Sequence, residues 1–445
     1  MLSTQGLTGH VVLPSSPEYD KARQNYNGRF NKFPSIIVYC EVTEDVVNAI
    51  RWVRQNRFPF RVRSGRHSYE AYSLMNDGLI IDVSRLQKLQ IDKVSNTVQI
   101  GAGLQLSLLY EALWSQGVTI PAGTCPTVAA SGLTLGGGYG FLSRLLGMTC
   151  DNLLELEMVT AQGEVIHVNN NQHSDLFWAC QGGGDGSFGV VTSFTFRVHQ
   201  IENVSRYRMT WSFDQLKNVV RHFQMWAPYI DARLTSSLVL PAENQGDLRS
   251  DGVFVGTENE LRQIVAPLSE ATQPKSVEFY NNTWIETVHH FAGTPVDQEK
   301  FKNSSAFIYE TLSESALNVL VENLRLAPGY ANLISLSALG GRVSEIPSDG
   351  TAFVHRQALI LVQYLSYWSQ NIEEDENIQW IERFRNSMLP YTHGAYRNYC
   401  DSLITDWPLA YFGENISRLM KVKKIYDPEN LFYFPQSIPI YHPIY

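Results

Sequence analysis

The first 200 residues alternate apolar, β-branched runs with amphipathic segments, and glycine-containing loops separate them. A helix is expected from Thr43, which can cap it and is followed by two acidic residues. A second helix is expected over about 104–116, ending at Gly117. Four other runs are typical of buried strands: 35–40, 60–63, 79–83 and 153–160. This mixture of elements predicts an α+β domain.

The chain changes character near residue 201, where the glycine-containing loops stop. From there to about residue 390, strands at 236–240 and 359–367 mix with helices at about 315–326 and 373–388, which predicts a second α+β domain. A chain of 445 residues is too long for one simple core. The tail then regains a high density of short motifs. We therefore expect three segments: 1–200, 201–390 and 391–445.

The charge balance and the hydropathy exclude several partners. The formal net charge is −9 and no basic run occurs, so a nucleic-acid partner is not expected. No stretch approaches the roughly 18 apolar residues of a membrane span. The start lacks the basic head and apolar core of a signal peptide. We therefore expect no membrane partner and a cytoplasmic location, while the sequence indicates no oligomeric state.

The five cysteines are odd in number and widely spaced. They form neither a disulfide framework nor a metal-type Cys-x-x-Cys pair. No metal site is therefore expected.

Two candidate nucleophiles lie on separate loops. His67 follows Arg-Ser-Gly-Arg at 63–66, and Cys125 lies in Gly-Thr-Cys-Pro at 123–126. Tyr139 follows in a glycine-rich run at 135–140. An imidazole and a thiol, near glycines that let backbone approach a ligand, indicate a cofactor held by covalent bonds. The competing interpretation is a surface histidine in a tight turn and an inert, buried cysteine.

The turn around His67 also suits an anion. Successive backbone N–H groups of residues 64–68 can converge on a pyrophosphate as a nest. Arg63 and Arg66 add positive charge, and Ser64 and Ser68 add hydroxyl groups.

Residues 184–189, Gly-Asp-Gly-Ser-Phe-Gly, match the dinucleotide-binding pattern G-x-G-x-x-G. That pattern is meaningful only after a strand and before a helix. Here it follows a helix-like stretch at 174–181 and precedes a strand at 190–194. We reject a Rossmann fold and keep the loop as a candidate cofactor-contacting turn.

The ordered motifs resemble those of the berberine-bridge-enzyme-like flavin oxidoreductases, within the vanillyl-alcohol-oxidase group. The resemblance runs nearly end to end. Its motifs are Arg-Ser-Gly-Arg-His-Ser at 63–68, Gly-Thr-Cys-Pro at 123–126, Leu-Gly-Gly-Gly-Tyr-Gly at 135–140, Gly-Gly at 340–341 followed by Phe-Val-His-Arg at 353–356, Tyr-Arg-Asn-Tyr at 396–399, and Tyr-Asp-Pro-Glu-Asn-Leu-Phe at 426–432.

This resemblance implies a PCMH-type FAD-binding domain, formed by the N-terminal segment and the returning tail, with the middle segment lying over the flavin. It implies FAD bound covalently twice, through His67 to the flavin 8α-methyl group and through Cys125 to C6. The other residues that it places at the cofactor are Arg63, Ser64, Gly65, Arg66, Ser68, Gly123, Thr124, Val128, Gly132, Gly137, Gly138, Gly140, Gly189, Val191, Tyr396 and Asn398.

The chain departs from the family pattern beside the flavin. Ala129 stands where a glycine is usual, and Leu133 where histidine is frequent. Leu361 replaces the lysine of members that oxidise phenylpropenyl alcohols, which argues against that substrate group. Val128 matches the position at which valine accompanies reactivity with oxygen. The resemblance therefore implies an oxidase, which uses O2, more than a dehydrogenase.

Hydride transfer from an alcohol requires a base for the hydroxyl proton. The resemblance places Tyr399 over the flavin as that base, Tyr139 beside it as an assisting or positioning group, and Gln363 as a group that orients the substrate. Tyrosine has an ordinary pKa of about 10, so we expect positive charge or hydrogen-bond donors near its oxygen.

Three functions compete. The first is an FAD-dependent oxidase of carbohydrates or similarly bulky alcohols, with H2O2 as a product. The second is a secondary-metabolite oxidase that performs alcohol oxidation or oxidative cyclisation. The third is a flavin-loaded structural or coat protein without turnover. A carbohydrate groove would present aromatic platforms, for which Trp284, Tyr364 and Trp368 are candidates, although they could equally belong to the core.

Overall fold

The computed structural model describes residues 3–201, 203–293, 296–329 and 331–441. Two larger sheets and one short pair lie in the first 200 residues. The four-stranded sheet has the order β1 (His10–Val12), β2 (Ile36–Tyr39), β4 (Leu79–Asp82) and β3 (Phe60–Arg63), in which β4 is parallel to both neighbours. The antiparallel five-stranded sheet has the order β5 (Leu89–Asp92), β6 (Thr97–Gly101), β10 (Val190–Arg197), β8 (Leu153–Val159) and β9 (Val165–Asn169). β7 (Val118–Thr119) pairs with β11 (His199–Gln200).

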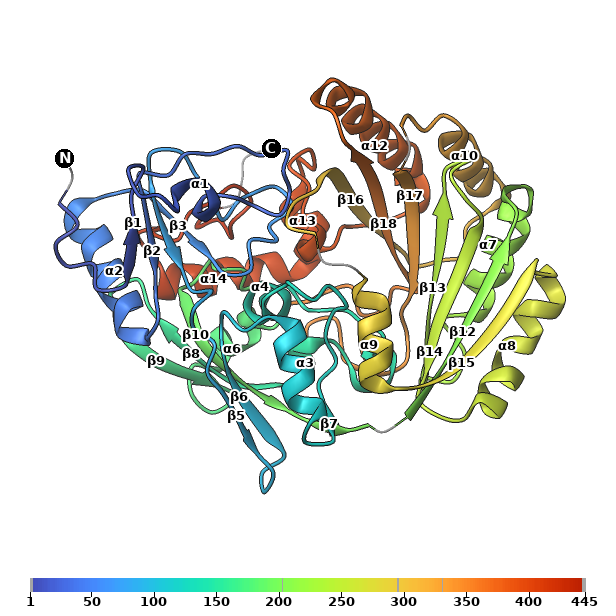
Figure 1. The fold of residues 1–445 in the computed structure, drawn as a ribbon, viewed down its shortest axis with the longest axis horizontal. Coiled ribbons are helices and arrows are strands. Elements are labelled where there is room, and N and C mark those ends of the chain that lie inside the picture. The colour runs from blue at the N-terminus through green and yellow to red at the C-terminus, as the bar shows by residue number, and fades with distance from the viewer. Residues whose placement is uncertain (1–2, 202, 294–295, 330, 442–445) are drawn as a thin grey trace.

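A seven-stranded antiparallel sheet is formed by the middle of the chain. Its order is β15 (Ser276–Thr283), β12 (Asn203–Trp211), β14 (Leu248–Phe254), β13 (Leu234–Pro241), β17 (Ala331–Ala338), β18 (Ile360–Trp368) and β16 (Lys300–Ile308). Helices α7 (Leu216–Trp226), α8 (Glu258–Thr272), α10 (Glu314–Arg325) and α12 (Glu374–Met388) pack their apolar residues against one face of it (Figure 1).

The C-terminal segment returns to the first part of the chain. Helices α13 (Trp407–Phe412) and α14 (Ile416–Tyr426) share one hydrophobic core with strands of the first 200 residues (Figure 1). Leu419 and Phe432, for example, belong to the same buried cluster as Ile81. The expected α+β architecture is confirmed, whereas the domain boundaries after residues 200 and 390 stay a prediction.

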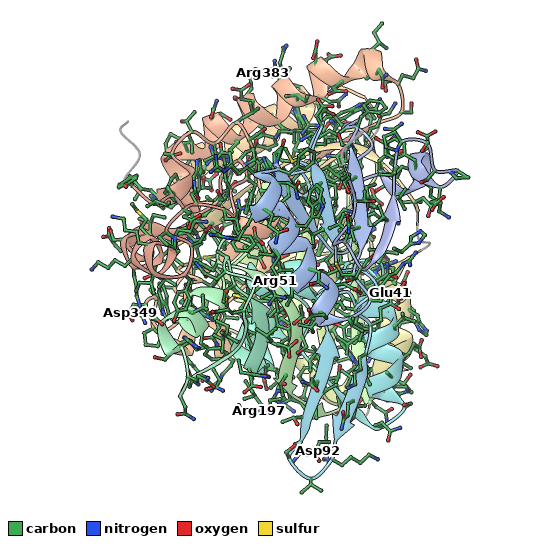
Figure 2. All side chains as sticks on the ribbon, turned by 90° about the vertical axis from the view of Figure 1, so that its left-hand side faces the viewer. Glu41, Arg51, Asp92, Arg197, Asp349 and Arg383 are labelled. Atoms are coloured by element: carbon green, nitrogen blue, oxygen red, sulfur yellow. The ribbon has the colours of Figure 1, made fainter. Side chains whose placement is uncertain are left out.

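The remaining helices position loops between these layers. They are α1 (Tyr19–Ala22), α2 (Thr43–Asn56), α3 (Leu106–Trp114), α4 (Ala130–Leu135), α5 (Ser143–Leu146), α6 (Ser174–Cys180), α9 (Trp284–Ala292) and α11 (Arg342–Glu345). Charged side chains such as Arg51, Asp92 and Arg383 are exposed on the surface (Figure 2). Of the helices that the structure describes, none combines the length and the apolar character of a membrane span.

The start of α2 is capped differently from the expectation. Val42 occupies the cap position and Thr43 is the first helical residue, with its hydroxyl donating to Glu157 instead. Asp45 Oδ2 accepts hydrogen bonds from the backbone N–H groups of Glu41 and Val42, at 2.9 and 3.2 Å. The acidic first turn, rather than the threonine hydroxyl, therefore satisfies the free N–H groups at this end of the helix.

Candidate active site

One cavity of about 270 Å³ lies where the end of β3, the start of α4, the loop before β10 and the C-terminal segment meet. Twelve of the residues expected to contact the cofactor or substrate line it: Arg63, Ser64, Gly65, Arg66, His67, Ser68, Val128, Gly132, Gly189, Val191, Asn398 and Tyr399. The 184–189 loop contributes Asp185, Gly186 and Gly189, and it connects a helix to a strand as expected.

The His67 loop presents unpaired backbone donors to this cavity. Within the part of the chain that the structure describes, no backbone N–H group of residues 65–69 donates to a protein acceptor. Arg66 adopts the left-handed conformation, with φ of 63°. Successive N–H groups that include a left-handed residue form a concave anion site. Gly65 is required here because an added Cβ would lie 2.6 Å from the backbone nitrogen of Ala129.

Arg63 adds buried positive charge to the same cavity. Its Nε donates to Asp82 Oδ2 at 2.6 Å, and the side chain is fully buried. Both terminal nitrogens are buried and have no hydrogen-bond partner among the described residues. Since buried donors are nearly always satisfied, these nitrogens and the N–H groups of the loop fit the pyrophosphate of FAD.

The two candidate attachment residues both contact one hydroxyl group. Thr127 Oγ1 is 2.8 Å from His67 Nε2 and 3.9 Å from Cys125 Sγ. Burial, followed by the nearby charge of Arg66, lowers the pKa of His67 to about 4. The imidazole is therefore neutral at neutral pH, the form in which it is a nucleophile. Cys125 is half-buried beside the cavity rather than among its lining residues.

The Tyr399 ring faces the cavity between two other tyrosine rings. It lies parallel to Tyr69, with centroids 5.9 Å apart and planes at 8°, and nearly perpendicular to Tyr396, with centroids 5.0 Å apart. Tyr396 does not line the cavity, because its hydroxyl accepts the backbone N–H of Gly138 at 2.8 Å.

The expected lowering of the Tyr399 pKa is absent. Burial raises the pKa of Tyr399 to about 12. Among the described residues no charged group opposes this rise. Within the described part of the chain, neither a cation nor a hydrogen-bond donor therefore stabilises the phenolate of Tyr399.

Tyr139 and Gln363 connect this region to the seven-stranded sheet. Tyr139 donates to the carbonyl of Ala338 on β17 at 3.0 Å. Burial raises the pKa of Tyr139, and the charge of Arg144 opposes the rise. Gln363 Nε2 donates to Asn303 Oδ1 at 2.9 Å, and Asn303 Nδ2 donates to the carbonyl of Tyr399 at 2.9 Å. Neither Tyr139 nor Gln363 lines the cavity itself.

Other glycines of the motifs are needed because neighbouring atoms pack too closely for a Cβ. A Cβ at Gly138 would lie 2.2 Å from Thr149 Oγ1, and one at Gly140 would lie 1.9 Å from a backbone oxygen. The residues of the expected set that lie outside the cavity lining are Gly123, Thr124, Cys125, Gly137, Gly138, Gly140, Tyr139, Gln363 and Tyr396.

The sequence interpretation did not single out several residues that the structure brings to the site. Tyr69 lines the cavity only two residues after His67, so its position in the loop could have indicated it. Arg397 Nε lies 2.6 Å from Asp185 Oδ2 at the cavity wall. The contact between Arg397 and Asp185 could not be predicted from the sequence, because the two residues lie far apart in the chain.

The three candidate aromatic platforms belong to the core. Trp284, Tyr364 and Trp368 are 4%, 0% and 3% exposed. Trp284 donates to Thr119 Oγ1 at 2.9 Å, and Tyr364 belongs to the cluster beneath the helices of the seven-stranded sheet. They therefore offer no surface on which a sugar could stack.

Comparison with known proteins confirms the PCMH-type FAD-binding fold that the motifs imply. A family model described as FAD binding domain matches residues 34–169, and one described as berberine and berberine like matches residues 395–439. The FAD-linked oxidoreductase YgaK of Bacillus subtilis is 43% identical over 97% of both chains. Reticuline oxidase of Eschscholzia californica is 28% identical over 98% of this chain and 90% of that protein.

Solved structures show the same likeness. Physcomitrella patens BBE-like 1 has a TM-score of 0.93 and 31% identity over 98% of both chains. A chitooligosaccharide oxidase has a TM-score of 0.90 and 26% identity over 97% of both chains. The protein belongs to the berberine-bridge-enzyme-like family of FAD-linked oxidoreductases.

Proposed function

We propose that this protein is an oxidase that carries FAD on two covalent bonds, through His67 and Cys125. It takes a hydride from an alcohol carbon of a carbohydrate or similarly bulky substrate and reduces O2 to H2O2. The observation that carries this proposal is the position of Tyr399, whose phenol faces the cavity that His67 also lines. When bound, FAD supplies the electron acceptor for the hydride.

The protein's own contribution is to position the substrate and to remove its hydroxyl proton. Tyr399 is the proposed base, because its phenol faces the cavity whereas the hydroxyl of Tyr139 is engaged by Ala338. Tyr69, which also lines the cavity, then holds the substrate beside it. Gln363 maintains the backbone at Tyr399 through Asn303.

An uncharged, hydroxyl-bearing stretch on β13, β17 and β18 of the seven-stranded sheet supports a carbohydrate as the substrate, and it ends at β14, where Asp251 lies in register with Ser237. On the face opposite the helices, Ser237 pairs in register with Ser337, and Ser335 pairs with Gln363. All four are half-buried. The other residues of this face on β13, β17 and β18 are uncharged. Hydroxyl and amide groups without charges suit a neutral polyol better than a charged substrate.

The likeness to the chitooligosaccharide oxidase supports the same class. The second candidate is oxidation of a secondary metabolite, which is favoured by the likeness to reticuline oxidase. A role without turnover has no such support, because the relatives are FAD-linked oxidoreductases.

The test is a screen of the purified protein for H2O2 release with mono- and oligosaccharides, aromatic alcohols and alkaloids. Release that is confined to sugars supports the proposal. Release with only aromatic alcohols or alkaloids favours the second candidate. Flavin reduction by a substrate without H2O2 formation in air would contradict an oxidase.

A further inference from the structure

The hydroxyl group of Thr127 contacts both candidate attachment residues. Its Oγ1 is 2.8 Å from His67 Nε2 and 3.9 Å from Cys125 Sγ. The imidazole nitrogen and the sulfur are therefore no further apart than these two distances added together. Thr127 is half-buried and lies only two residues after Cys125, so the turn itself brings its hydroxyl to the thiol.

The His67 ring is held on two sides. Tyr26 stacks on it, with centroids 4.3 Å apart and planes at 26°, and the backbone N–H of Tyr26 donates to the carbonyl of Arg66 at 2.9 Å. Thr127 holds the Nε2 edge. The Nδ1 atom has no hydrogen-bond partner among the residues that the structure describes, and His67 lines the cavity.

In a neutral imidazole, one ring nitrogen carries the N–H and the other carries a lone pair. The hydrogen bond at one nitrogen decides which of the two carries the N–H. If Nε2–H donates to Thr127 Oγ1, the lone pair that attacks carbon is on Nδ1. The hydroxyl hydrogen of Thr127 is then free to point toward Cys125 Sγ. A donor at this sulfur favours the thiolate, which is the nucleophilic form of cysteine.

We propose that Thr127 is a positioning residue for both covalent attachments of FAD. Its hydroxyl accepts the Nε2–H of His67, leaves Nδ1 as the attacking atom, and donates toward Cys125 Sγ. This inference rests on the bicovalent attachment proposed above and assigns how the protein directs it.

The chemistry balances for each bond. One C–H bond of the flavin is replaced by a C–N bond at His67 or a C–S bond at Cys125. The imidazole loses its Nε2 proton to solvent, with Thr127 Oγ1 as the adjacent hydrogen-bond acceptor, and the thiol loses its S–H proton to solvent. Each attachment releases two electrons and two protons, and O2 accepts them to form one H2O2.

The test compares the full-length wild type with Thr127→Val, which keeps the shape, and Thr127→Ser, which keeps the hydroxyl. Protein produced under riboflavin limitation is incubated with FAD in air. Flavin on the peptides that contain residues 67 and 125 is then quantified by mass spectrometry over time. Loss of one hydrogen bond to the attacking ring should slow attachment at His67 about tenfold in Thr127→Val. Thr127→Ser should retain the wild-type rate, and attachment at Cys125 should slow in Thr127→Val.

Thr134→Val is the matched control, because this nearby threonine donates only to Ala130 within α4. It should attach flavin at the wild-type rate. Circular dichroism checks folding, and Thr127→Ala replaces the valine variant if that variant does not fold.

Two results would overturn the inference: both bonds forming at the wild-type rate in Thr127→Val, or a wild type with no flavin on His67. A wild type that carries both bonds but oxidises no alcohol contradicts the proposed function alone.

Discussion

Lys302 Nζ on β16 lies 2.5 Å from Asp401 Oδ1, two residues after Tyr399. The same ammonium group lies 2.6 Å from Glu70 Oε1, on the loop that follows His67. All three side chains are buried. One cation therefore ties the seven-stranded sheet to both segments that build the candidate active site.

Replacing this cation should destabilise the protein strongly. In Lys302→Met, Glu70 keeps its ion pair with Arg29 at 3.0 Å, whereas buried Asp401 loses its only cationic partner among the described residues. Removing one partner of a buried ion pair costs about 3–5 kcal/mol. Urea unfolding should show that loss, whereas Lys300→Met, on the same strand but bonded at the surface to Asn371, should change little. Equal unfolding midpoints for the two variants would show that the cluster contributes nothing to stability.

Tyr399→Phe should slow flavin reduction while leaving substrate binding intact. Loss of a general base costs about 10²- to 10⁴-fold in rate. Anaerobic stopped-flow measurement of flavin absorbance, as substrate concentration is varied, separates the rate from the Kd. The exposed Tyr229→Phe is the control. Unchanged reduction in Tyr399→Phe would remove this residue as the base.

The raised pKa of Tyr399 sets the direction of the pH dependence. With a pKa of about 12, the phenol is protonated at neutral pH, and the basic phenolate becomes more abundant as pH rises. Below this pKa, the rate of flavin reduction should rise about tenfold per pH unit. Measurement between about pH 6 and 9 checks this, and Tyr399→Phe should lose the dependence. A plateau in the wild type within this range would contradict it.

The proposed double attachment can be read from denatured protein. The acid-precipitated wild type should remain yellow, with flavin on the peptides of both His67 and Cys125. Cys125→Ala should keep a single bond through His67, because the two nucleophiles lie on separate loops. The double variant His67→Ala/Cys125→Ala should release its flavin into the supernatant. Peptide mass mapping gives each result, and free flavin from the wild type would exclude both bonds.

The local sequence was sufficient to predict the loops that line the cavity. The turn at 63–68 places Arg66 in the left-handed conformation, and its whole motif lies within six consecutive residues, whereas the need for Gly65 comes from Ala129 on another loop. The strands at 60–63 and 79–82 also agree with their apolar runs. Motif order predicted the position of Tyr399 in the cavity wall, because the tail carries short, recognisable patterns.

Contacts between distant segments could not be read in the same way. The ion pairs of Lys302 could not be predicted from the sequence, since its partners Glu70 and Asp401 lie 232 and 99 residues away. Trp284 is core rather than platform because Thr119, 165 residues earlier, accepts its indole N–H. The contact of Thr127 with His67 likewise joins two loops that only the folded chain brings together.

The return of the tail to the first core has a consequence for biosynthesis. A ribosome releases the whole seven-stranded sheet before it releases residues 395–439, which complete the cavity. The nascent chain therefore has no finished chamber in which to hold a prosthetic group. A premature stop codon before this segment would leave one wall of the chamber unbuilt.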